Sequence, residues 1–122
     1  MSHLVTIQAK IRDPIAIAAA CARLNLPTPV QGTAKLFSGE CVGLLVQLPG
    51  WQYPAVIDTQ NGEVKFDIFQ GNWGDQNHLD RFLQMYAVER AKLEARKNGY
   101  GVTEQSLANG SIKLQISEGA QA

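Results

Sequence analysis

Few side chains in this 122-residue sequence have types and spacings that could carry out chemistry. It holds two histidines and two cysteines, and neither Cys21 nor Cys41 has the CxxC or Cys/His spacing of a metal or redox site. No phosphate-binding loop or catalytic motif stands out. We therefore expect reduced, buried thiols, no metal ion, no cofactor and no catalytic residues, and we favour a protein that is not an enzyme.

One arginine lies where an expected long helix should be apolar. At about 100° per residue, Arg90 falls in the same stripe as Leu83 and Tyr86, so its guanidinium must reach solvent, pair or face a pocket. Glu94, four residues further on, is a local partner, and we favour this pairing. The alternative is a small-ligand-binding protein or enzyme with a pocket near Arg90, lined also by Tyr86 and His78.

His78 is followed two residues later by Asp80, a pair that could suggest acid–base chemistry. Residues at this spacing do not share a helical face, so we favour an exposed surface histidine. Asp75 precedes the expected helix as its N-cap and occupies the backbone donors that an anion would need.

Both tryptophans lie in glycine-flanked loops, at 50–54 and 71–74. Large aromatic side chains in such turns either cap the core or form a binding surface. We favour core capping, because aromatic residues are mostly buried. The functional hypothesis is contact with a protein, a peptide or a small ligand through Trp51, Tyr53 and Trp73.

The charges of the chain are balanced. Lysine and arginine number 11, and aspartate and glutamate number 11, so the formal net charge is zero. This balance does not support a general attraction to nucleic acid or to an anionic membrane. A modest basic face formed by Arg81, Lys92 and Arg96 leaves RNA binding as a weaker alternative. Low net charge eases self-association, so a homo-oligomer stays open.

The hydrophobic pattern predicts an α+β fold with the element order β-α-β-β-β-β-α-β-β. Alternating apolar residues predict a half-buried strand at 5–11, Asp13-Pro14 marks the start of a helix, and Asn61-Gly62 predicts a two-residue type I′ turn. Because hairpin connections dominate, we expect a mainly antiparallel sheet of about six to seven strands with two helices on one face. The remaining expected elements are helices at 15–25 and 76–98 and strands at 33–37, 41–48, 54–58, 63–69, 100–106 and 111–116.

We expect a single domain at 1–117 and a frayed tail at 118–122. The N-terminus lacks the charged and apolar segments of a signal peptide, and no apolar stretch approaches the ~20 residues that a membrane-spanning helix needs. A cytoplasmic protein without a membrane partner is the expectation.

Three motifs resemble those of an uncharacterised family. They are Met-Ser-His-Leu-Val-Thr-Ile with Ile11-Arg12-Asp13, then Leu48-Pro49-Gly50-Trp51-Gln52-Tyr53-Pro54, and Gly71-Asn72-Trp73-Gly74-Asp75 leading to Leu79-Asp80-Arg81-Phe82. The resemblance covers about residues 2–116 and points to short hypothetical proteins, with a domain of unknown function, from plastid, cyanobacterial and other bacterial genomes. It implies no activity or catalytic residue. Genes of that family often lie near those of AAA-type ATPases, so the resemblance implies such an ATPase as a partner.

The leading hypothesis is therefore a non-enzymatic protein-interaction or adaptor module working with an AAA-type ATPase. It would bind its partner through the two aromatic loops and the outer face of the long helix. The loops are aromatic, and few polar side chains of that helix face are expected to be engaged in strong interactions within the chain.

Overall fold

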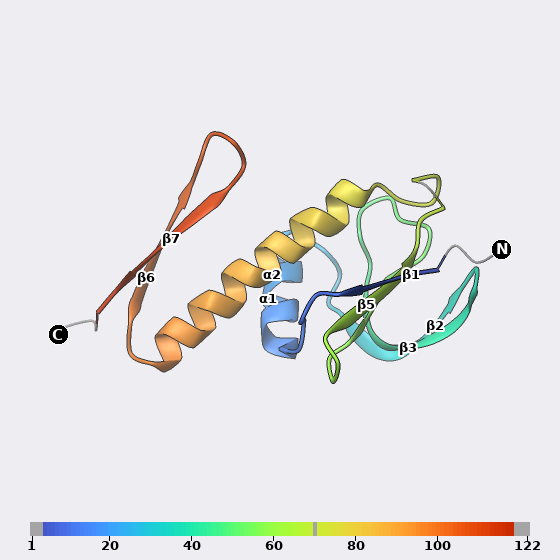
Figure 1. Ribbon diagram of the computed structural model, residues 1–122, viewed down its shortest axis with the longest axis horizontal. Coiled ribbons are helices and arrows are strands. Elements are labelled where there is room, and N and C mark those ends of the chain that lie inside the picture. The colour runs from blue at the N-terminus through green and yellow to red at the C-terminus, as the bar shows by residue number, and fades with distance from the viewer. Residues whose placement is uncertain (1–3, 70, 119–122) are drawn as a thin grey trace.

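The computed structural model describes residues 4–69 and 71–118, over which seven strands and two helices are arranged as an α+β fold (Figure 1). The helices are α1 (Pro14–Arg23) and α2 (Gln76–Lys97). The strands are β1 (Leu4–Gln8), β2 (Val30–Leu36), β3 (Gly39–Val46), β4 (Ala55–Asp58), β5 (Glu63–Asp67), β6 (Gly101–Ser106) and β7 (Ile112–Ser117). Apart from Glu118, the expected tail at 118–122 lies outside the described residues.

The strands form two separate antiparallel sheets. Five of them make a sheet in the order β1-β5-β4-β3-β2, while β6 and β7 pair with each other in a second sheet. The expectation of one sheet with about six to seven strands is therefore wrong. The cause is α2, whose 22 residues span about 33 Å. This helix carries the chain away from the five-stranded sheet, so that the β6–β7 hairpin lies on the other side of the helices (Figure 1).

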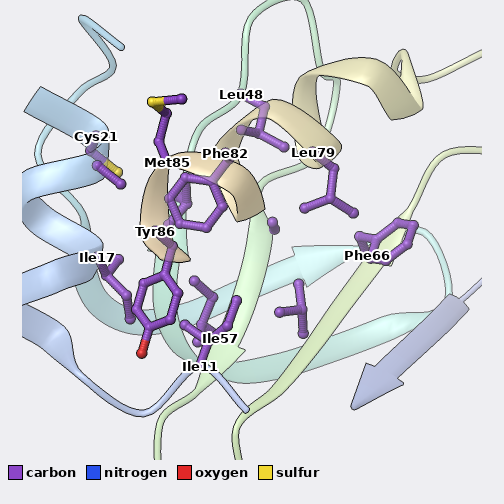
Figure 2. Packing of buried hydrophobic residues seen from close by; sticks show 14 of the residues in the cluster. Ile11, Ile17, Cys21, Leu48, Ile57, Phe66, Leu79, Phe82, Met85 and Tyr86 are labelled. Carbon is purple, nitrogen blue, oxygen red and sulfur yellow. The ribbon is translucent and has the colours of Figure 1, made fainter. Parts of the chain in front are cut away.

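Both helices pack on one face of the five-stranded sheet. Successive side chains of a strand point to opposite faces, so Ala55 and Ile57 of β4 join the core under the helices while Val56 faces the other way. Helix α1 is rich in alanine and packs against α2. The core between these elements contains Ile11, Ile17, Cys21, Leu48, Ile57, Phe66, Leu79, Phe82, Met85 and Tyr86 (Figure 2).

The β2–β3 hairpin bends over the opposite face of the sheet. Strand β4 pairs with β3 only from Leu44 to Val46, so the half of β3 nearest its turn curls away from β4. Ser38 in that turn donates its backbone N–H and its hydroxyl to the two carboxylate oxygens of Asp67, at 3.1 and 3.2 Å. Because Asp67 is fully buried, these hydrogen bonds supply partners that its carboxylate needs.

Local side-chain capping sets where both helices begin. The Asp13 carboxylate accepts hydrogen bonds from the N–H groups of Ile15 and Ala16, at 2.9 and 3.3 Å, and Asp75 accepts one from Asn77 at 2.9 Å. Gly99, with a φ of +81°, follows the end of α2, as expected for a glycine stop. Both helices are one residue shorter than the predicted helices at 15–25 and 76–98.

Two local expectations, the end of the first strand and the turn at Asn61-Gly62, are wrong. The first strand ends at Gln8 instead of residue 11, because Lys10 adopts a φ of +55° that a strand does not allow. The Asn61-Gly62 dipeptide does not form a two-residue type I′ turn, since Gly62 has a positive φ of +73° and Asn61 does not. The connection is longer, and Asp58 Oδ1 accepts the N–H groups of Gln60 and Asn61 within it.

A closed ring of four charged side chains fastens the β6–β7 hairpin to both helices. Arg23 of α1 pairs with Glu89 of α2 and with Glu104 of β6, and Lys92 of α2 pairs with the same two carboxylates at 3.3 and 2.8 Å. We call these four residues the charged quartet. Ile112 of β7 also packs against the main core. Gln84 of α2 donates its side-chain amide to the carbonyl of Gly110 in the hairpin turn at 2.9 Å. The hairpin is thus held by apolar packing, by a hydrogen bond and by charge pairing.

Neither helix in the described part of the chain combines the length and the apolar character that crossing a bilayer requires.

Candidate functional site

Four aromatic side chains from three connections meet on the surface, and we call them the aromatic patch: Phe37, Tyr53, Phe69 and Trp73. Phe37 lies in the β2–β3 turn and Tyr53 in the β3–β4 loop, while Phe69 and Trp73 lie between β5 and α2. The ring centroid of Trp73 is 4.9 Å from that of Phe69, 5.0 Å from that of Phe37 and 5.5 Å from that of Tyr53. These stacked and tilted geometries are the ones that aromatic pairs favour.

The aromatic patch is only partly covered by the rest of the chain. Phe37 is 59% exposed, and the other three rings are half-buried. Exposed clusters of large apolar side chains mark surfaces that contact other molecules. The patch itself contains no charged side chain.

Trp51 has a different place from Trp73. Core capping, which the sequence favoured for both, is confirmed for Trp51, and the functional hypothesis that put Trp51 and Trp73 in one contact surface is wrong. Trp51 is only 4% exposed and belongs to the main core, with its ring 5.7 Å from that of Phe66. Its indole Nε1–H donates to the carbonyl oxygen of Asp75 at 3.0 Å. A Cβ atom added to Gly74 would lie 2.7 Å from the Trp51 ring, so this position requires glycine. Trp51 therefore connects the β3–β4 loop to the β5–α2 loop from within the core, and it does not belong to the aromatic patch.

Backbone hydrogen bonds hold the loops of the patch together. The N–H of Gln52 donates to the carbonyl of Trp73 at 2.8 Å, and the N–H of Trp73 donates to Ile68 at 2.9 Å. Gln47 closes the first loop by donating its side-chain amide to the carbonyl of Trp51 at 2.8 Å. Phe69 adopts a φ of +45°, which is strained for a bulky residue. In this strained conformation the Phe69 ring stacks on Trp73.

Two of the three residues expected around a pocket near Arg90 do meet. Arg90 and Tyr86 line a cavity of about 470 Å³ together with the segment from Lys10 to Pro14. The guanidinium of Arg90 pairs with Glu94 at 3.0 Å and with Asp13 at 3.6 Å, which matches the favoured interpretation of this residue. Pairing with Glu94 is the main reason that the pKa of Arg90 is raised.

His78 does not belong to that cavity. It is exposed and lines a separate, apolar cavity of about 200 Å³ beside Arg81 and Pro49. On α2 it precedes Arg90 by twelve positions, a separation of about 18 Å along a helix axis. The structure therefore does not bring His78 into one site with Arg90 and Tyr86.

Little in the described residues offers reactive chemistry. Among residues 4–69 and 71–118, no group of three or more His, Cys, Asp or Glu side chains is arranged to hold a metal ion. Both cysteines are free, and burial raises the pKa of the Cys21 thiol to about 11. At neutral pH this thiol is protonated and is a poor nucleophile.

The basic face expected on α2 is interrupted. Lys92 lies within 4 Å of both Glu89 and Glu104, so its charge is neutralised within the charged quartet. Arg81 donates to the side chain of Gln84 at 2.9 Å. Nucleic-acid surfaces need clustered positive charge that is free to meet phosphates, so the arrangement gives the RNA-binding alternative no support.

Comparison with protein-family profiles, with curated protein sequences and with solved structures finds no match to this chain.

The sequence hypotheses included Tyr53 and Trp73 but missed Phe37 and Phe69. Each missed residue lies within two positions of a glycine with positive φ, Gly39 or Gly71. This is the signal that singled out Trp73, namely a large aromatic side chain beside a glycine turn. The same signal, applied to phenylalanine as well as to tryptophan, would have added Phe37 and Phe69 to the candidate residues.

Proposed function

We propose that this chain is a non-enzymatic protein-interaction module whose aromatic patch binds a neutral, apolar segment of a partner protein. The observation that carries the proposal is the convergence of Phe37, Tyr53, Phe69 and Trp73 from three connections onto one partly exposed surface. Tryptophan, tyrosine and phenylalanine are enriched in protein–protein interfaces and supply much of their binding energy.

The surroundings of the patch favour a neutral partner segment. The four rings offer apolar area, and the exposed side chains of Gln52 and Asn72 beside them offer amide donors and acceptors. An apolar centre with a polar rim is the usual composition of a binding surface. A strongly charged segment would find no counter-charge among the four patch residues.

The partner proposed first is an AAA-type ATPase, and this choice depends on the family resemblance alone. The binding surface differs from the one expected from the sequence, because Trp51 lies in the core and the patch gains Phe37 and Phe69. A second copy of the chain is the competing occupant, since a zero net charge does not oppose self-association.

The test is the affinity of the purified chain for the AAA-type ATPase encoded nearest to its gene, measured by isothermal titration calorimetry. Phe37→Ala is the main variant, because this side chain is 59% exposed and contributes little to folding. Interface hot spots contribute about 2 kcal/mol or more, so we expect the dissociation constant to rise roughly 30-fold. Trp73→Ala should act in the same direction.

Val42→Ala is the matched control, since Val42 is an apolar side chain that is 68% exposed and lies outside the patch. It should change the affinity less than about twofold, as expected for a residue outside an interface. Absence of binding by the unmodified chain refutes the ATPase as the partner. Equal losses in the Phe37 and Val42 variants, with native circular dichroism in both, refute the patch as the binding surface. Self-association that Phe37→Ala abolishes, without ATPase binding, assigns the patch to a second copy and also overturns the proposal.

A further inference from the structure

The cavity beside Arg90 contains a buried hydroxyl group with an unused proton. Tyr86 is 7% exposed, and its hydroxyl oxygen accepts hydrogen bonds from the backbone N–H groups of Arg12 and Asp13, both at 3.2 Å. Among the residues that the structure describes, none accepts a hydrogen bond from this hydroxyl. Figure 2 shows the Tyr86 oxygen pointing away from Phe82 and the other core side chains. Because a buried donor normally has a partner, this hydroxyl is placed to donate a hydrogen bond to a molecule in the cavity.

Backbone hydrogen bonds hold the segment from Lys10 to Asp13, which forms the wall of the cavity next to Tyr86. The carbonyl oxygen of Gly62 accepts the N–H groups of Ala9 and Ile11, at 3.1 and 3.3 Å. Lys10 lies between them with a φ of +55°, and a Cβ atom on Gly62 would lie 2.6 Å from the Lys10 Cα. Together with the two bonds to Tyr86, these contacts fix the segment that carries Lys10 and Arg12. The cavity wall is therefore already ordered before anything binds, which lowers the cost of binding.

The charges around the cavity favour an anion. Its lining includes the cations Lys10, Arg12 and Arg90 and the carboxylate of Asp13. With Glu94, which pairs with Arg90 beside the cavity, three cations face two carboxylates, a net of one positive charge. The Asp13 carboxylate is already engaged, since Oδ1 caps α1 and Oδ2 lies 3.6 Å from Arg90 Nε. Glu94 also pairs with Arg90 at 3.0 Å, which leaves Lys10 and Arg12 as the cations without an ion pair among the described side chains.

We propose that this cavity binds the phosphate group of a small phosphorylated molecule. A phosphate monoester carries about −1.5 to −2 charges at neutral pH, which matches the two cations of the lining that have no ion pair, Lys10 and Arg12, whereas a carboxylate carries only one charge. Its oxygens can accept from the Tyr86 hydroxyl, the Arg12 guanidinium and the Lys10 ammonium at once. The volume of about 470 Å³ lies within the range of small-molecule pockets, roughly 300–1,000 Å³, and leaves room for the rest of the ligand. The site shares no residue with the aromatic patch, so it stands or falls independently of the proposed function.

The test is binding of phenyl phosphate and of inorganic phosphate to the full chain in 0.15 M salt, followed by changes in the amide resonances of Arg12 and Asp13. Benzoate is the carboxylate comparison. We expect phenyl phosphate to bind at least about tenfold more tightly than benzoate, because each 1.4 kcal/mol of additional interaction is a factor of ten. Arg12→Gln should lower the affinity for phenyl phosphate at least tenfold. Arg96→Gln, which removes an exposed arginine outside the cavity, should change it less than twofold.

Three results would overturn the assignment. One is the absence of phosphate binding up to millimolar concentrations. Another is equal affinity for benzoate and phenyl phosphate, which would make the site a general anion site. The third is an equal loss of affinity for phenyl phosphate in the Arg12→Gln and Arg96→Gln variants, which would show that only the overall charge of the chain matters. Because Arg12 is exposed, its side chain can be replaced with the fold intact, and the unchanged amide spectrum of the free variant verifies this.

Discussion

Replacing Glu104 by glutamine tests how the β6–β7 hairpin is fastened to the helices. The side chain of Glu104 is 25% exposed and pairs with Arg23 and Lys92. These pairs, led by the hydrogen bond from Arg23, lower the pKa of Glu104 from 4.5 to about 2. A glutamine of the same shape keeps one hydrogen bond but loses the charge, and leaves Arg23 and Lys92 to share Glu89.

The size of the effect can be bounded in two ways. A pKa difference of this size corresponds to at most roughly 3 kcal/mol, and solvent screening of a partly exposed group reduces it. Two partly exposed ion pairs contribute about 1–2 kcal/mol together. We therefore expect the free energy of unfolding to fall by about 1–2 kcal/mol, which for a domain of this size lowers Tm by roughly 4–8 °C.

The pH dependence gives a sharper test than the melting temperature at one pH. Because the folded-state pKa of Glu104 is depressed, its contribution is present above its ordinary pKa of 4.5 and is lost as the pH falls toward about 2. The stability difference between the unmodified chain and the Glu104→Gln variant should therefore be constant at neutral pH and shrink below about pH 4.5. Thermal melts followed by circular dichroism at a series of pH values measure it.

Glu40→Gln is the control, since Glu40 is exposed and lies outside every ion pair among the described residues. Surface substitutions of this kind change stability by no more than about 0.5 kcal/mol. An equal effect in the two variants, or a Glu104 effect that persists unchanged at pH 2, would refute the role given to the charged quartet.

Three further predictions concern Gly74, Tyr86 and the two cysteines. Gly74→Ala should lower the free energy of unfolding, measured in urea, by about 1–3 kcal/mol, because the new Cβ would overlap the Trp51 ring. The control is Gly32→Ala, whose Cβ would be 3.8 Å from its nearest neighbour and which should destabilise the chain less. Equal destabilisation by the two substitutions would contradict the steric explanation. Tyr86→Phe leaves two backbone N–H groups without their acceptor and should lower stability by about 1–3 kcal/mol; an unchanged denaturant midpoint would contradict this. In iodoacetamide labelling at pH 8, the half-buried Cys41 should react before Cys21, whose pKa is raised to about 11, and the reverse order would refute the burial of Cys21.

Features set by neighbouring residues were the most predictable from the sequence. Asp13 and Asp75 were expected as helix caps, and their carboxylates accept the expected backbone N–H groups. Capping depends on atoms within three residues, so the local sequence contains the needed information. The α+β class and the antiparallel pairing also follow from local periodicity and short connections.

Features set by distant residues were not predictable in this way. The division into two sheets depends on the direction in which α2 carries the chain, which no local pattern specifies. Trp51 and Trp73 have similar glycine-flanked surroundings, yet only Trp51 enters the core, because it packs on Gly74 and Phe66. The segment around Lys10 is shaped by Gly62 and Tyr86, which lie far away in the sequence.

Acrylamide quenching of tryptophan fluorescence tests the role of the aromatic patch most directly. The chain has two tryptophans, of which Trp51 is 4% exposed and Trp73 is half-buried in the patch, so quenching of the free chain reports mainly on Trp73. A tryptophan-free version of the AAA-type ATPase keeps the signal specific to this chain. If the ATPase binds through the patch, saturating amounts should strongly reduce quenching, and Phe37→Ala should weaken this protection while Val42→Ala preserves it. Quenching that stays unchanged in the fully formed complex would contradict the proposal.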